Sequence, residues 1–361
     1  MAKDSKYNKE KEKKEFIKLN EEIKNLPAFC KDFLLSKAKR NTNTALAYTA
    51  DLAIFFEYLK TYCPLVKGLE IKDYDLSVLE KLTYRDINEY QDFLSKTHPE
   101  MASSDDYCYS NDLRGIQRRM CSLRGLYKYL CSHKEISNDP TLGADPIVIR
   151  ENFHNIVRMN SDEVEKLLET VQNGVGSSKQ KAFLEHTKLR DYAILYLMLN
   201  TGIRVSECVG LDVQDLNFNE NSMLVFRKGK KENILYFDDE LADVLQKYIN
   251  EERPSLLGDA EDDALFISRD KTRITARSIQ RMLKKYASVA VSNKKITPHK
   301  LRSTYGTALY NQTGDIRLVA DVLGHSDINV TSKHYAAVDD TRRRKASLIK
   351  IYDKDPNNII I

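Results

Sequence analysis

Residues that suit phosphate chemistry recur along the second half of this chain. TGIRVSE places an arginine after a glycine turn, FRKGKKE places a lysine between two β-prone runs, and TPHKLRSTYG carries a histidine and an arginine three positions apart. LGHSDINVTSKHY adds a histidine in a glycine-containing turn and a tyrosine ten residues later. In chain order they are Arg204, Lys228, His299, Arg302, His325 and Tyr335. Each alone has a structural explanation, so the question is what they can do together.

Together these residue types can break a DNA phosphodiester without a metal ion. Two guanidiniums can hold the non-bridging oxygens bidentately and stay charged at any working pH. A tyrosine phenol is a weak nucleophile because its usual pKa is about 10. Neighbouring cations favour the phenolate, and a histidine can accept the phenol's proton. A lysine on a hairpin can protonate the departing 5′-oxygen, and a further histidine can donate a hydrogen bond to the phosphate.

These segments resemble the tyrosine recombinase (phage integrase) family, whose catalytic set is Arg, Lys, His-x-x-Arg, His or Trp, and Tyr, in that order. All six positions match, and Glu207 falls at the family's acidic position that supports the first arginine. The resemblance covers residues 26–350, and the layout is similar to that of Xer-type members. It implies that Tyr335 is the nucleophile of a site-specific recombinase that forms a 3′-phosphotyrosyl bond. It also implies that no metal, ATP or other cofactor is needed.

The hairpin lysines leave a choice open. Lys230 and Lys231 compete with Lys228, but the family places its lysine just before the glycine, which favours Lys228. Lys230 and Lys300 are then expected to contact DNA. His334, next to the tyrosine, is interpreted as a structural neighbour.

The residues before about 140 have the pattern of a small all-helical domain. In NDLRGIQRRMCSLRGLYKYL the apolar residues alternate spacings of three and four, which is typical of one helix face. These residues are Leu113, Ile116, Met120, Leu123, Tyr127 and Leu130. Arg114, Arg118 and Arg119 form either a solvated face or a DNA contact, and the catalytic set favours DNA. A second helix start, near Thr42 and Thr44, is expected to approach a groove.

The whole chain is expected to be mainly α, with a two-domain C-clamp architecture. A helical core-binding domain precedes an α+β catalytic domain whose small antiparallel sheet contains a hairpin of strands 222–227 and 233–237. The expected divisions are a charged leader over 1–24, the helical DNA-binding domain over 25–140, a linker over 141–158, the catalytic domain over 159–338 and a terminal helix and tail over 339–361.

The composition says more about where in the cell this protein is found than about which molecule it binds. The 57 basic and 53 acidic residues leave a net charge of +4, which is too small to identify a ligand. No apolar run approaches the roughly 18 residues of a membrane span, and the first residues lack the apolar core of a secretion signal. None of the six cysteines forms a zinc-type spacing. A cytoplasmic, nucleoid-associated bacterial protein that does not bind membranes is expected.

The resemblance also implies an assembly. A homotetramer would act on two sites in double-stranded DNA, each with short inverted repeats, and exchange strands through a Holliday junction. The tail would dock on the neighbouring subunit. Dimer resolution and mobile-element integration or excision use the same chemistry, so the resemblance does not choose between them. It also does not say whether an accessory protein takes part. The alternatives are a catalytically silent DNA-binding or architectural protein and a topoisomerase-like enzyme.

Overall fold

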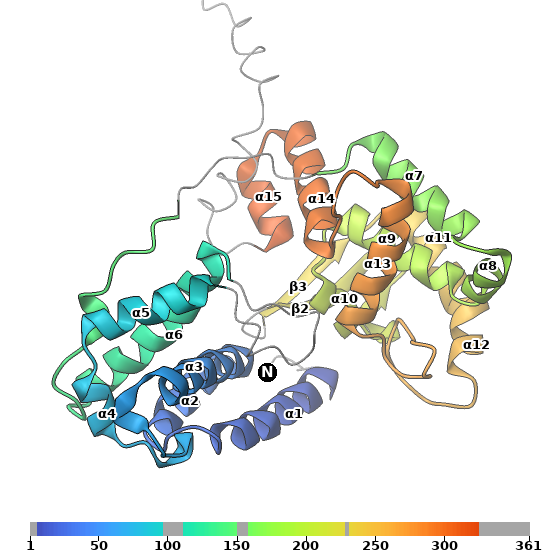
Figure 1. The fold of residues 1–361 in the computed structure, drawn as a ribbon. Coiled ribbons are helices and arrows are strands. Elements are labelled where there is room, and N and C mark those ends of the chain that lie inside the picture. The colour runs from blue at the N-terminus through green and yellow to red at the C-terminus, as the bar shows by residue number, and fades with distance from the viewer. Residues whose placement is uncertain (1–5, 97–110, 150–157, 228–230, 325–361) are drawn as a thin grey trace, which may run out of the picture. The chain divides into compact units, whose positions relative to one another are not determined.

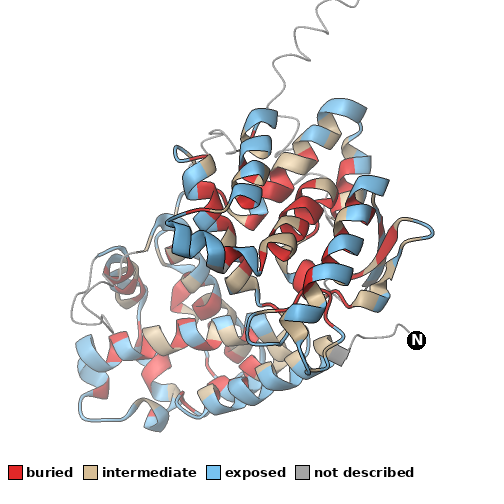
Figure 2. Cartoon of the chain, turned by 90° about the vertical axis from the view of Figure 1, so that its right-hand side faces the viewer, coloured by how far each residue is buried: buried red, intermediate tan, exposed pale blue. Residues whose placement is uncertain are grey.

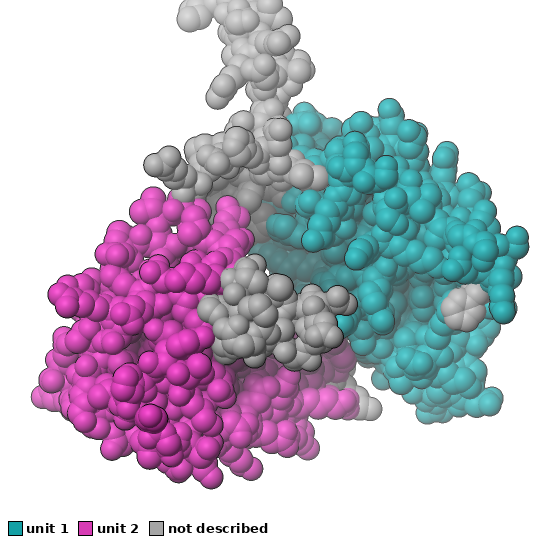
Figure 3. Space-filling view, in the orientation of Figure 1, with its two compact units in different colours: residues 1–5, 153–361 teal, residues 6–152 magenta. Residues whose placement is uncertain are grey.

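The chain folds as two compact units. The computed structural model describes residues 6–96, 111–149, 158–227 and 231–324. Contacts group Lys6–Asn152 into one unit, here called the helical unit, and Phe153–Ile361 into a second, here called the sheet unit (Figure 3). Helices dominate both units, and one small antiparallel sheet lies in the second. The expected fold class, mainly α with an α+β catalytic domain, is confirmed.

The helical unit has six α-helices in its described residues (Figure 1). They are α1 (Lys6–Ile23), α2 (Cys30–Ala38), α3 (Thr42–Tyr62), α4 (Leu76–Lys81), α5 (Tyr84–Ser95) and α6 (Leu113–Ser132). Short 3-10 turns lie at Pro64–Val66, Ile71–Asp73 and Pro140–Leu142. Asn41 begins α3 by accepting the Thr44 backbone N–H at 2.9 Å, and Asp112 begins α6 by accepting the Gly115 N–H at 2.7 Å.

The charged leader is part of this unit rather than a separate segment. Residues 6–23 form α1, which packs against α3. Leu19 is fully buried and Ile23 is buried one turn later, so both enter the core of the helical unit. The alternating Lys and Glu residues hid this short apolar stripe. The boundary expected at residue 24 therefore does not separate two structural parts.

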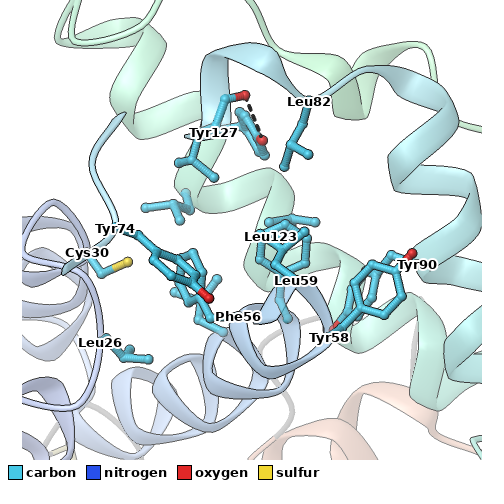
Figure 4. Close-up of a cluster of buried hydrophobic side chains, with 14 of the residues drawn as sticks. Leu26, Cys30, Phe56, Tyr58, Leu59, Tyr74, Leu82, Tyr90, Leu123 and Tyr127 are labelled. Carbon is cyan, nitrogen blue, oxygen red and sulfur yellow. Dashed lines mark hydrogen bonds between the residues drawn. The ribbon is translucent and has the colours of Figure 1, made fainter. Parts of the chain in front are cut away.

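The core of the helical unit is rich in aromatic side chains. Phe56 and Leu59 from α3 belong to the same buried cluster as Leu123 and Tyr127 from α6 (Figure 4). The Tyr127 hydroxyl donates a hydrogen bond to the Leu79 carbonyl at 3.3 Å, so its one polar atom has a partner. The apolar face predicted for α6 is buried from Ile116 onward. Leu113 is 53% exposed because it lies in the first turn, beyond the reach of the core.

The sheet unit has nine α-helices and three strands in its described residues. The helices are α7 (Ser161–Asn173), α8 (Ser178–Glu185), α9 (Lys188–Thr201), α10 (Val205–Gly210), α11 (Asp239–Lys247), α12 (Arg253–Leu257), α13 (Ala276–Ala290), α14 (Pro298–Thr313) and α15 (Ile316–Leu323). A π-helix, Tyr248–Glu252, links α11 to α12, and a 3-10 turn lies at Val213–Asp215. The strands are β1 (Leu216–Asn217), β2 (Ser222–Arg227) and β3 (Lys231–Tyr236), in the order β1-β2-β3.

Helix α9 is the centre of the sheet unit. It packs against α7, α11 and α14, and ten of its fourteen residues are buried. Figure 2 shows buried residues in red along the inner faces of the helices. It ends at Gly202, which has a left-handed φ of 61°. A Cβ there would lie 2.5 Å from Tyr305 Cδ1, so glycine is required both for the turn and for the close packing of α14. The glycine turn predicted from TGIRVSE is thus confirmed, and the chain turns directly into the segment that carries Arg204.

The predicted hairpin forms as well. Strands β2 and β3 pair antiparallel with Met223 opposite Leu235 and Arg227 opposite Lys231. The second strand begins two residues earlier than expected, and the short strand β1 was missed.

The start of the expected linker also belongs to the helical unit. Pro140 and Thr141 are buried, and the Asp145 N–H donates to the Asn88 side chain at 2.9 Å. No helix in the described part of the chain is both long and apolar enough to cross a membrane.

Candidate active site

Arg204 lies at the junction between α9 and α10, where a buried carboxylate fixes it. The Glu207 side chain is 4% exposed and accepts both the Arg204 backbone N–H at 3.0 Å and Arg204 Nη1 at 2.7 Å. Glu207 acts as the third residue of a capping box does, but Arg204 has no acceptor in its side chain, so only this half of the box forms. Glu207 therefore fixes the guanidinium as well as the start of α10.

Arg302 reaches the same place from another helix. It lies in the second turn of α14 and is buried, with 4% of its surface exposed. Its Nη1 donates to the Gly202 carbonyl at 2.6 Å, two residues before Arg204, and its Nη2 donates to the Leu323 carbonyl. The left-handed turn at Gly202 thus directs one carbonyl toward Arg302 and the following residues toward α10.

The two arginines meet at the C-terminal end of α15. Arg204 Nη2 donates to the Gly324 carbonyl at 3.0 Å, next to the Leu323 carbonyl that Arg302 uses. The last carbonyls of a helix lack partners within the helix and carry partial negative charge. They are suitable acceptors for guanidiniums. The structure therefore brings Arg204, Glu207 and Arg302 into one site.

A third arginine at this helix end was missed in the sequence. Arg227, the last residue of β2, donates through Nη1 to the Asp321 carbonyl at 3.1 Å and through Nη2 to the Val322 carbonyl at 2.6 Å. Burial lowers the pKa of Arg227; Glu207 opposes this shift and the charge of Arg204 adds to it. In the sequence Arg227 appears only as one more basic residue before the hairpin, so no local signal distinguished it.

His299 and Lys300 lie in the first turn of α14. His299 is exposed, one helical turn before Arg302 on the same helix, as the HKLR spacing predicted. Lys300 Nζ donates to the Lys295 carbonyl at 2.6 Å. Lys300 thus has a partner within its own unit.

Four predicted residues lie outside the described residues. They are Lys228, Lys230, His325 and Tyr335. Lys231, the competing choice for the hairpin lysine, is the first residue of β3, but its side chain is not described. His334 and the terminal segment 339–361 lie outside the described residues. The described chain reaches the positions just before two of them, since Arg227 precedes Lys228 and Gly324 precedes His325.

The predicted DNA-contact residues of the helical unit divide into two groups. Arg114, Thr42 and Thr44 lie in the first turns of α6 and α3, with Arg114 and Thr44 exposed. Arg118 and Arg119 instead bind Asp51 on α3, a carboxylate with 1% of its side chain exposed. The Arg119 side chain is only 11% exposed and also donates to Asn111. Arg119 therefore has a structural role that its place in a basic run did not reveal.

Asp51 should be important for the stability of the helical unit. It accepts Arg118 at 2.7 and 2.6 Å and Ser122 Oγ at 2.7 Å. Asp51→Asn keeps the volume but removes the charge and turns an amide donor toward guanidinium donors. We expect it to lower the free energy of unfolding by about 3 kcal/mol, measured by urea unfolding followed by circular dichroism. Asp92→Asn, an exposed position on α5, is the matched control and should leave the transition unchanged.

Within the described ranges, no group of three or more His, Cys, Asp or Glu side chains could hold a metal ion. The positive charge of the described site comes from its arginines.

Comparison with known proteins agrees with this arrangement. The sequence profile of the phage integrase family matches residues 157–342, more than half of the chain. The tyrosine recombinase XerC of Caldanaerobacter subterraneus is 31% identical over 332 residues, which cover 89% of this chain and 85% of the relative. The chain belongs to the phage integrase family. The expected enzyme class, a tyrosine-type recombinase, is confirmed at this level.

Other family members are similar over comparable lengths. The tyrosine recombinase XerS of Streptococcus pyogenes is 30% identical over 359 residues, which cover 88% of this chain and 94% of the relative. A crystal structure of the XerH site-specific recombinase, bound to a palindromic difH substrate in a post-cleavage complex, has a TM-score of 0.62. It is 20% identical and covers 87% of this chain and 82% of the other, which supports the same fold. The Xer-type resemblance is thereby confirmed.

Proposed function

We propose that this protein is a site-specific DNA recombinase that cleaves and rejoins DNA through a 3′-phosphotyrosyl intermediate. The observation that carries the proposal is the pair Arg204 and Arg302, which come from separate segments and bind adjacent carbonyls at the end of α15. Their guanidiniums are held in place before any substrate arrives. Such preorganised positive charge is what a phosphoryl-transfer transition state requires.

The chemistry follows from this pair and the remaining predicted residues. Tyr335 attacks the phosphorus, the bond from phosphorus to the 5′-oxygen breaks, and a bond from phosphorus to the phenol oxygen forms. His299 accepts the phenol proton, Lys228 protonates the departing 5′-oxygen, and His325 donates a hydrogen bond to the phosphate. Because the phosphotyrosyl bond keeps the energy of the broken bond, rejoining needs no ATP. The arginines supply the charge, so no metal is needed.

DNA binding involves both units in this proposal. Arg114, Arg118 and the starts of α3 and α6 contact phosphates, with Thr42 and Thr44 near a groove. Lys230 and Lys300 contact the backbone from the sheet unit. The XerH complex with a palindromic substrate supports short inverted-repeat sites.

The active assembly in this proposal is a homotetramer on two such sites. Each subunit passes its tail, 339–361, to a neighbour, so that assembly and delivery of Tyr335 are coupled. Strand pairs are exchanged one at a time through a Holliday junction. The biological task is Xer-like dimer resolution or integration and excision of a mobile element.

Covalent trapping tests the proposal. Nicked DNA fragments from the gene's flanks and from the host's replication terminus are incubated with the protein in EDTA and denatured in SDS. We expect protein–DNA adducts that map to one inverted repeat and persist in EDTA. Mass spectrometry should find the nucleotide on the tryptic peptide 334–342, which contains Tyr335 as its only tyrosine.

The same experiment separates the alternatives. A requirement for added metal would contradict the mechanism, and a nucleotide on another peptide would contradict the choice of nucleophile. Specific binding without any adduct would point to a catalytically silent DNA-binding protein.

A further inference from the structure

Arg227 connects the β-hairpin to the end of α15. It is the last residue of β2, and it is 94 and 95 positions away in sequence from the carbonyls it binds, those of Asp321 and Val322. Both Nη atoms are used, so the contact is bidentate and fixes the orientation of the guanidinium as well as its position. Arg227 is thus a specific link between two distant segments rather than a solvated basic residue.

With this link, the carbonyls at the end of α15 are shared among three arginines. Arg227 binds those of residues 321 and 322, Arg302 binds that of residue 323, and Arg204 binds that of residue 324. Four consecutive carbonyls therefore each receive a guanidinium N–H. Since like charges repel, this arrangement depends on each arginine keeping its own acceptors and on the partial negative charge of the helix end.

Gly324 shows how closely Arg227 packs. Gly324 ends α15 with a left-handed φ of 60°, and a Cβ there would lie 2.1 Å from Arg227 Nη1. The glycine is therefore required both for its backbone conformation and for the space that the guanidinium occupies. Arg227 lies directly against the residue whose carbonyl holds Arg204.

We propose that Arg227 is a positioning residue for DNA cleavage, an inference that rests on the proposed function. By binding the carbonyls of residues 321 and 322, it fixes the last turn of α15. Arg302 and Arg204 then each bind one further carbonyl, those of residues 323 and 324. Without it, the Val322 carbonyl loses its guanidinium partner and the Asp321 carbonyl keeps the Gly324 backbone N–H. Arg204 and Arg302 lie beside the freed acceptor and can then turn away from the phosphate. Arg227 acts on the reaction through the arginine pair.

Two variants and one control test this role. Arg227→Met removes the guanidinium while keeping much of the apolar stem, and Arg227→Lys keeps the charge but loses the bidentate geometry. Arg317→Met is the control, because it removes one positive charge from an exposed position in the first turn of the same helix. Each protein is assayed for hydrogen–deuterium exchange in the segment 316–324, for DNA affinity and for single-turnover cleavage at saturating protein.

We expect Arg227→Met to speed exchange at the end of α15 and to slow cleavage by about 10- to 100-fold, the range that small misplacements of catalytic groups cause. DNA affinity should stay close to that of the wild type. Arg227→Lys should recover part of the cleavage rate, and Arg317→Met should match the wild type in exchange and cleavage.

Several results would overturn the role. Unchanged exchange at 316–324, or cleavage by Arg227→Met equal to that of Arg317→Met, would exclude positioning. A loss of affinity that accounts for the whole loss of cleavage would make Arg227 a DNA-binding residue instead. If Arg227→Met fails to fold, Arg227→Lys carries the same comparisons. If the wild type forms no adduct, the proposed function fails, and the exchange measurement still decides whether Arg227 anchors the helix.

Discussion

Tyr335→Phe is expected to abolish covalent attachment to DNA and leave specific DNA binding intact. The change removes only the phenol oxygen, so the surface that meets the DNA stays almost the same. Without that oxygen no phosphotyrosyl bond can form, and the whole nucleophilic route is lost rather than slowed. Adduct formation on nicked substrates in EDTA measures the first effect, and a gel-shift titration measures the second.

Tyr236→Phe is the matched control for this change. Tyr236 is 71% exposed at the end of β3, so loss of its hydroxyl should affect neither cleavage nor binding. Residual adducts with Tyr335→Phe at the wild-type level would show that another residue attacks the phosphate. Loss of binding together with cleavage would show instead that the phenol contributes to recognition.

Arg302→Ala is expected to give the second largest effect, a decrease of cleavage of about 10²- to 10³-fold or more, the scale of one lost transition-state donor. Arg302 is buried and connects the Gly202 carbonyl to that of Leu323. The substitution therefore removes positive charge from the transition state and opens the contact between α14 and α15. Single-turnover cleavage of a suicide substrate at saturating protein measures the loss.

Arg302→Lys separates these two contributions. Lysine keeps the charge but offers one nitrogen, so it cannot bind both carbonyls as the guanidinium does. We expect its cleavage to remain well below the wild type, with a melting temperature nearer to the wild type than that of Arg302→Ala. Wild-type cleavage by either variant would remove Arg302 from the catalytic set, and with it the observation on which the proposed function rests.

Much of the fold was predictable because local signals were strong. Gly202 forms the turn expected before Arg204, and Asn160 caps α7 through a reciprocal pair with Glu163. The motifs around Arg204 and Arg302 were short, ordered and spaced as in the family, which fixed the family before any fold was known. The structure then placed these two arginines and Glu207 in one site.

The missed features depend on contacts between distant segments. Arg227 gains its role from the end of α15, and Asp51 gains its role from α6, 67 and more residues away. Leu19 and Ile23 were hidden by the charged residues around them in α1. Hydrophobic periodicity predicts which face of a helix is buried, and motif spacing predicts which residues form a catalytic set. They do not report which distant partner a basic or acidic residue will bind.

The use of backbone carbonyls at the end of α15 has a consequence for how this region can vary. The side chains of Asp321 and Val322 supply none of the acceptors that the arginines use, so these positions can change residue type while the arginines keep their acceptors. A one-residue insertion in α15 is different, because it would rotate every later carbonyl by about 100° around the helix axis. The site should therefore tolerate substitutions at residues 321 and 322 but no change in the length of this helix.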